Sequence, residues 1–110
     1  MLTWEKAEEL YSRAKDKEKG KPIANNTILV KVDDSTFGVR LYSTYVVLIH
    51  KDGTYTLDSG GYKKKTTKER INEFSPVYVH QKDYNWFVGE EHFFNGMKLK
   101  KNENGEWEVV

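Results

Sequence analysis

From Asn26 onward, the chain consists of short runs of β-branched and aromatic residues that turn-forming residues interrupt every few positions. This spacing excludes a long helix over most of the chain and predicts antiparallel strands joined by short turns, the pattern of a β-meander. The strands are expected at 27–32, 37–42, 45–50 and 54–57, and again at 77–81, 86–89, 97–100 and 107–110.

Turn residues lie between most of these strands. Asp33-Asp34-Ser35 and Lys51-Asp52-Gly53 predict hairpin turns in the first group, and Asn95-Gly96 and Asn104-Gly105 are strong two-residue hairpin signals in the second. The link at Ser43-Thr44 has two interpretations, because the segment LYSTYVVLIH fits either one strand with a bulge or two separate strands.

Two segments have helical character. Thr3 can cap an N-terminal helix within residues 1–20, which Gly20 and then Pro22 would end, and residues 21–26 are expected to be a linker. Apolar residues of this first helix recur at helical spacing: Trp4, Ala7, Leu10, Tyr11 and Ala14.

The second helix is expected at residues 67–74, because Thr66 stands three residues before Glu69 in the arrangement of a capping box. The predicted fold class is therefore α+β, a single domain over residues 1–110. It would contain an N-terminal helix, a mainly antiparallel sheet built from a meander and hairpins, and one short central helix.

Composition excludes several kinds of chemistry. The 110 residues include no cysteine, which rules out disulfides, thiolate metal sites and cysteine nucleophiles. The three histidines lack metal-ligand spacing, and no serine lies in a nucleophile-elbow pattern, so we expect no metal site, no cofactor and no enzyme activity.

No apolar run is long enough to span a bilayer, and the N-terminus does not resemble a signal peptide, so a soluble cytoplasmic protein without a membrane role is expected. The net charge of +1 gives no general attraction to nucleic acid, and electrostatic binding would need a local cluster.

That cluster lies in SGGYKKKTTKERINEF, residues 59–74, where two glycines and three lysines precede the predicted helix. The start of a helix exposes backbone N–H groups and the positive end of its dipole, which favours bound anions. Alternatively, the stretch is only a corner between strand and helix, with solvent-facing lysines. Neighbouring lysines repel one another and the dipole, which argues for an anion, although the glycines do not fit a known nucleotide loop.

Residues 39–74 resemble a family of short, mostly uncharacterised proteins encoded by bacteriophages and prophages. The shared pattern is an Arg-Leu-x-x-Thr strand, an Asp-Gly hairpin, a Leu-x-Ser-Gly-Gly turn ending in Trp or Tyr, and Thr-Thr-Lys-x-Arg-x-Asn. Tyr42 and Tyr62 stand where that family has His and Trp. The matching residues are Arg40, Leu41, Thr44, Asp52, Gly53, Leu57, Ser59, Gly60, Gly61, Thr66, Thr67, Lys68, Arg70 and Asn72.

Two groups of candidate site residues follow. The ligand or anion candidates are Arg40, Tyr62, Lys63, Lys64, Lys65, Thr66, Thr67, Lys68, Arg70 and Asn72. Aromatic residues between positions 84 and 94 would form either core or a stacking surface, and the surface candidates are Tyr84, Trp86 and Phe93.

The resemblance implies a phage or prophage accessory protein in the cytoplasm of the bacterial host. Our leading hypothesis is an anti-defence inhibitor that binds a host defence protein or sequesters a nucleotide-derived signal. The first alternative is a nucleic-acid-binding module that uses residues 63–65 and the aromatics. The second is a structural, oligomeric protein of the virion.

Overall fold

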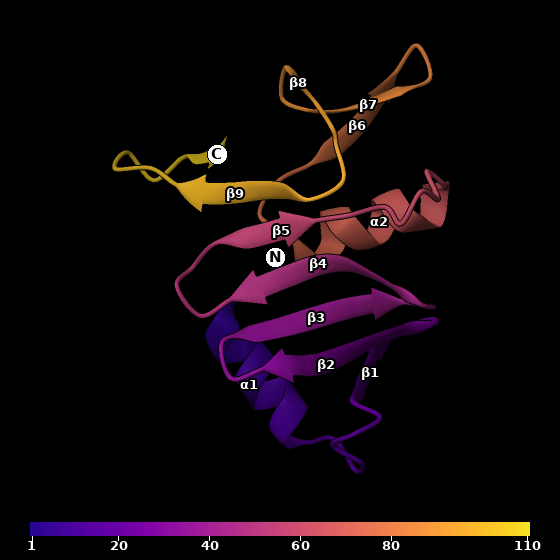
Figure 1. Ribbon diagram of the computed structural model, residues 1–110, viewed down its shortest axis with the longest axis vertical. Helices are drawn as coiled ribbons and strands as arrows, with labels where there is room; N and C mark the ends of the chain where they lie inside the picture. The colour runs from indigo at the N-terminus through magenta and orange to yellow at the C-terminus, as the bar shows by residue number, and fades with distance from the viewer.

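The computed structural model describes all residues, 1–110, and contains two helices and ten strands (Figure 1). In chain order these are α1 (Trp4–Ser12), β1 (Lys21–Ala24), β2 (Thr27–Asp33), β3 (Thr36–Leu41), β4 (Thr44–His50), β5 (Tyr55–Leu57), α2 (Lys65–Phe74), β6 (Val79–Lys82), β7 (Asn85–Val88), β8 (Glu91–His92), β9 (Met97–Lys101) and β10 (Trp107–Val109).

The strands form two antiparallel sheets. The larger has seven strands in the order β1-β2-β3-β4-β5-β9-β10, and the smaller has three in the order β6-β7-β8. The small sheet is inserted between β5 and β9, which are neighbours in the large sheet, and it projects beyond α2 (Figure 1). The predicted α+β class with a mainly antiparallel sheet is confirmed.

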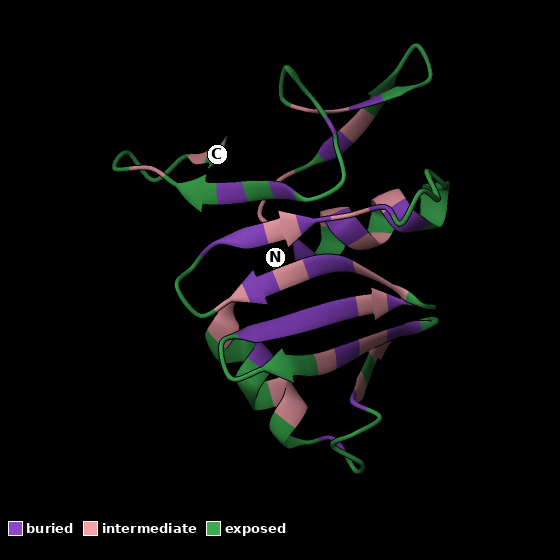
Figure 2. Ribbon diagram, viewed as in Figure 1, coloured by how far each residue is buried: buried purple, intermediate pink, exposed green.

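Both helices pack on the same face of the large sheet. Every residue of β3 except Arg40 is buried, and Phe37 contacts the rings of Trp4 and Tyr11 in α1 at centroid distances of 4.7 and 5.6 Å. Leu41, on the same face, is paired in register with Thr27, whose side chain contacts α2. The opposite face of the large sheet carries no helix (Figure 1). The buried residues of β3 and β4 lie at the centre of the sheet (Figure 2).

The segment LYSTYVVLIH contains both features that its sequence suggested. It forms two strands, joined at Tyr42-Ser43 with Tyr42 in a left-handed conformation (φ 54°). The register of β4 against β3 also shifts between Val39 and Arg40, and Val46 and Val47 are both buried next to this bulge. The irregularity therefore places two consecutive valines in the core.

The N-terminal prediction was wrong in its boundaries. The helix ends at Ser12 rather than near Gly20, because the Lys17 ammonium group donates to the carbonyl oxygens of Tyr11, Ser12 and Ala14 and holds the chain in turns. The expected linker 21–26 is largely strand β1, which forms backbone hydrogen bonds with β2. The sequence of this segment did not predict a strand.

One later prediction also needs correction. Asn95-Gly96 does not form a hairpin, because it carries the chain from β8 in the small sheet to β9 in the large one. The strand expected at 86–89 is present as β7, and the short strand β8, which was not predicted, follows it after a turn that contains Gly89. The hairpin at Asn104-Gly105, between β9 and β10, is confirmed.

His50 lies at the end of β4, on the face without helices, between two threonines. Its Nε2 atom is 2.8 Å from Thr56 Oγ1 and its Nδ1 atom is 3.3 Å from Thr36 Oγ1. Burial lowers the pKa of His50 below the ordinary value of 6.5, and the charge of Lys98 acts in the same direction while that of Asp52 opposes them. The fold therefore favours the neutral imidazole.

Stability is accordingly expected to fall on mild acidification. The unfolded chain takes up a proton on His50 at a higher pH than the folded one, so the free energy of unfolding decreases as the pH falls through 6.5 and below. Urea unfolding across this range checks the slope, which His50→Gln should reduce. The control His92→Gln removes an exposed imidazole and should keep the parent slope, and an undiminished slope in His50→Gln would contradict the assignment.

Candidate anion-binding pocket

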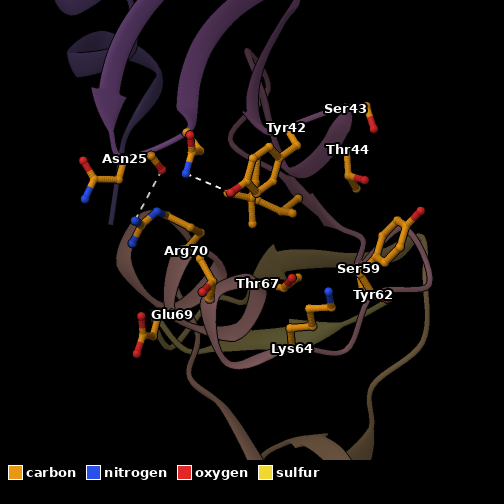
Figure 3. Close-up of a pocket in the computed structure, with 14 residues that line it drawn as sticks. Asn25, Tyr42, Ser43, Thr44, Ser59, Tyr62, Lys64, Thr67, Glu69 and Arg70 are labelled. Atoms are coloured by element: carbon orange, nitrogen blue, oxygen red, sulfur yellow. Dashed lines mark hydrogen bonds between the residues drawn. The ribbon is translucent and has the colours of Figure 1, made fainter.

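A pocket of about 650 Å³ lies between the turn end of the large sheet and the first half of α2 (Figure 3). Two turns form one wall, residues 25–26 between β1 and β2 and residues 41–44 around the β3–β4 turn. The other wall comes from the loop after β5 and from α2, between Ser59 and Arg70. Segments that are far apart in the sequence therefore meet here.

The loop after β5 is fixed by contacts within the protein. Ser59 is buried, and both its backbone N–H and its hydroxyl donate to Asn95 Oδ1, at 2.9 and 2.8 Å. Gly60 has a positive φ of 62° and lies against the Thr44 side chain, and its N–H donates to Asp58 Oδ1 at 2.6 Å. The Ser-Gly-Gly motif thus builds the corner and contributes no glycine-rich phosphate loop.

The start of α2 is open, and the predicted capping box is wrong. The helix begins at Lys65, two residues earlier than a Thr66 cap would allow, and Lys64 at the N-cap makes no side-chain hydrogen bond. The first turn contains no acidic residue, and the N–H groups of Lys65, Thr66 and Thr67 have no acceptor within the protein. These are the donors that a capping side chain or a bound anion satisfies.

Thr67 adds a hydroxyl group to these donors. Its side chain lines the pocket and only 5% of the residue is exposed, yet the hydroxyl makes no hydrogen bond to the protein (Figure 3). No fully buried side-chain oxygen or nitrogen lacks a partner in this structure, so the Thr67 hydroxyl must be reached from the pocket. An accessible hydroxyl without a protein partner is free to bind water or a ligand.

Positive charges exceed negative charges around the pocket. Glu69 lies 4.0 Å from Lys65, and Glu73 lies 3.6 Å from Arg70, so each carboxylate is opposed by a cation. Lys64 lines the pocket without an ion-pair partner, and its ammonium group lies 6.0 Å from the centre of the Tyr62 ring. The balance at the start of α2 is positive.

Arg70 has a structural role at the edge of the pocket. Its side chain is only 14% exposed, its Nε donates to Thr27 Oγ1 at 2.9 Å, and Nη2 lies 3.4 Å from the Asn25 carbonyl oxygen (Figure 3). These contacts tie α2 to the turn between β1 and β2. Arg70 therefore shapes the wall and adds positive potential, while most of its hydrogen-bonding capacity is already used.

The structure brings together five of the ten predicted ligand residues: Tyr62, Lys64, Thr66, Thr67 and Arg70. It does not bring in Lys63, Lys65, Lys68, Asn72 or Arg40. Arg40 lies between Val39 and Leu41 in β3 and points to the opposite face, the one without helices, so Arg40 and Arg70 do not share a pocket. Asn72 instead binds the backbone of Val79 in β6, at 2.6 and 3.0 Å.

The aromatic surface prediction was wrong for two residues. Trp86 and Phe93 are only 3% and 6% exposed and contact each other edge to face in the core, whereas Tyr84 is 94% exposed. The pocket also uses a residue that sequence reasoning missed, Tyr42, whose hydroxyl accepts a hydrogen bond from Asn26 at 2.9 Å. The sequence feature that could have identified Tyr42 is that it stands where the phage family has a histidine.

Residues 5–105 match the family model described as Kyanoviridae Gp96 protein. The chain belongs to this family. The match covers nearly the whole chain, including α2 and the pocket, and confirms the predicted resemblance to short phage-encoded proteins. Neither a curated protein nor a solved structure matches the sequence. No helix of this Gp96 family member is long and apolar enough to cross a membrane.

Proposed function

We propose that this Gp96 family member is a non-enzymatic phage accessory protein that binds a nucleotide-derived host signal in the α2 pocket and sequesters it. In the host cytoplasm, such capture would act against a defence response. The observation that carries the proposal is the convergence of unsatisfied donors: the open N–H groups of residues 65–67 and the Thr67 hydroxyl belong to the same helix start.

Two further properties favour a nucleotide. The volume of about 650 Å³ lies within the range of small-molecule sites and accommodates a nucleotide. The rings of Tyr42 and Tyr62 stand at the pocket wall, where an aromatic base can stack while its phosphate lies near Lys64. Burial of Trp86 and Phe93 removes most of the aromatic surface on which the nucleic-acid-binding alternative depended.

The variant Lys64→Asp tests the proposal because it should change stability and binding in opposite directions. Aspartate at the N-cap would accept from the open N–H groups and stabilise α2 by about 1 kcal/mol. The same carboxylate would occupy and repel the anion site. We expect native mass spectrometry to show one nucleotide bound to the parent protein, from a panel of mono-, cyclic and dinucleotides, and none bound to Lys64→Asp.

Lys15→Asp is the matched control, since it makes the same charge change at an exposed residue outside the pocket. It should keep the nucleotide adduct. A protein that binds no member of the panel, or that binds equally well with Lys64→Asp, would refute sequestration in this pocket. Loss of the adduct in both variants would point to nonspecific electrostatic binding instead.

A further inference from the structure

We infer that the ligand of the α2 pocket is a nucleoside phosphomonoester, held by its terminal phosphate at the start of α2 and by its base on Tyr62. This inference rests on the proposed function and narrows its ligand class. It distinguishes a terminal phosphate, with two charges near neutral pH, from the singly charged diester of a cyclic nucleotide.

The first argument is the uncompensated charge. Lys63, Lys64 and Lys68 make no ion pair in this structure, and all three lie within one turn of the beginning of α2. The positive end of the helix dipole adds to their field. A dianion gains more from such a field than a monoanion does, so the site favours a phosphomonoester.

The second argument is the number of donors. The N–H groups of Lys65, Thr66 and Thr67, the Thr67 hydroxyl and the Lys64 ammonium group are all free to donate. A phosphomonoester offers three terminal oxygen atoms with several lone pairs, whereas a diester offers two. The donor set therefore matches the acceptor capacity of a terminal phosphate better.

The third argument places the base. The Lys64 ammonium group lies 6.0 Å from the centre of the exposed Tyr62 ring, so a phosphate bound to Lys64 lies beside that ring. Across the pocket, the hydrogen bond from Asn26 holds Tyr42 in place (Figure 3). The space between them suits a planar group attached to the phosphate through a sugar.

Isothermal titration calorimetry of the full chain can test whether the ligand is a nucleoside phosphomonoester. The ligands are the ribonucleoside 5′-monophosphates, their 3′,5′-cyclic forms, ribose 5-phosphate and a 5′-phosphorylated oligonucleotide. We expect the best monophosphate to bind about tenfold or more tightly than its cyclic form, and its affinity to decrease below about pH 6 as the phosphate dianion takes up one proton and becomes a monoanion. Ribose 5-phosphate should bind more weakly than the nucleotide because it lacks the base.

Two substitutions separate phosphate from base recognition. Thr67→Val replaces a hydroxyl that has no protein partner with a group of equal size, so it should fold normally and bind the monophosphate about tenfold more weakly. Tyr62→Leu should reduce the affinity for the nucleotide to that for ribose 5-phosphate, while Tyr62→Phe should bind like the parent. Tyr78→Leu, at an exposed tyrosine outside the pocket, is the control.

The contrary results separate failure of the monoester inference from failure of the proposed function. If a cyclic nucleotide or a dinucleotide binds as tightly as any monophosphate, the monoester inference is wrong and nucleotide capture stands. If the phosphorylated oligonucleotide binds more tightly than every monophosphate, the small-molecule assignment is overturned. If no nucleotide binds at all, both the inference and the proposed function fail.

Discussion

Gly60→Ala is expected to lower the free energy of unfolding by about 3 kcal/mol, from backbone strain and steric overlap together. Gly60 has a φ of 62°, and an added Cβ would lie 2.4 Å from Thr44 Oγ1 and 3.1 Å from Thr44 Cβ. The latter atom is fixed to strand β4, so rotation of the threonine side chain cannot remove the whole overlap. Urea unfolding followed by tryptophan fluorescence measures the loss.

Gly61→Ala separates the two causes. Its φ of 83° also disfavours alanine, but an added Cβ meets no atom within 4 Å. It should therefore cost about 1–2 kcal/mol, less than Gly60→Ala. The double variant Gly60→Ala/Thr44→Ala should recover part of the difference. Equal losses of unfolding free energy at the two glycines would show that backbone conformation alone causes the loss. The contact between the loop and β4 would then contribute little.

Local patterns predicted much of the fold. Runs of β-branched and aromatic residues identified β2, β3 and β4, because such runs are read within a few residues. The turn residues at 33–35 and 51–53 marked the β2–β3 and β4–β5 hairpins for the same reason. The capping box failed for a similar reason. Thr66 and Glu69 have the right spacing, but the loop after β5 enters the helix two positions earlier, with Lys64 at the cap.

The candidate site could be predicted only in part, because its walls meet through long-range contacts. The sequence pointed to the start of α2, and five of the ten candidate residues line the pocket there. It could not place Tyr42 opposite Tyr62, since that depends on how the β3–β4 turn packs over the helix. Nor could it separate Thr67, whose hydroxyl is free, from Asn72 five residues later, whose amide is fully engaged.

The sequence also did not predict that the small sheet is inserted between β5 and β9. Asn95-Gly96 has the local composition of a hairpin turn, yet Asn95 accepts two hydrogen bonds from Ser59, and the Gly96 N–H donates to the Leu57 carbonyl. Those partners precede Asn95-Gly96 by more than thirty residues, as the Ser59–Asn95 separation of 36 shows. Tertiary contacts thus use a turn sequence to return the chain to the large sheet.

Asn72→Ala is expected to lower the free energy of unfolding by about 2–4 kcal/mol and to loosen the small sheet. Asn72 Oδ1 accepts from the Val79 N–H at 2.6 Å, and Asn72 Nδ2 donates to the Val79 carbonyl at 3.0 Å. This amide satisfies the main chain of β6, an edge strand, as a neighbouring strand would. Alanine would leave both groups of the buried Val79 without these partners.

The measurement for Asn72→Ala is hydrogen exchange together with urea unfolding. Amides of residues 79–93 should exchange faster than in the parent protein, while those of β2–β4 should change only as far as global stability changes. Glu69→Ala is the control, because it introduces alanine at an exposed position of the same helix. Asn72→Asp retains the acceptor for the Val79 N–H but sets a carboxylate against the carbonyl, so it should not restore stability. If Asn72→Ala unfolds like Glu69→Ala, the packing of Trp86 and Phe93 in the core is enough to hold the small sheet against α2.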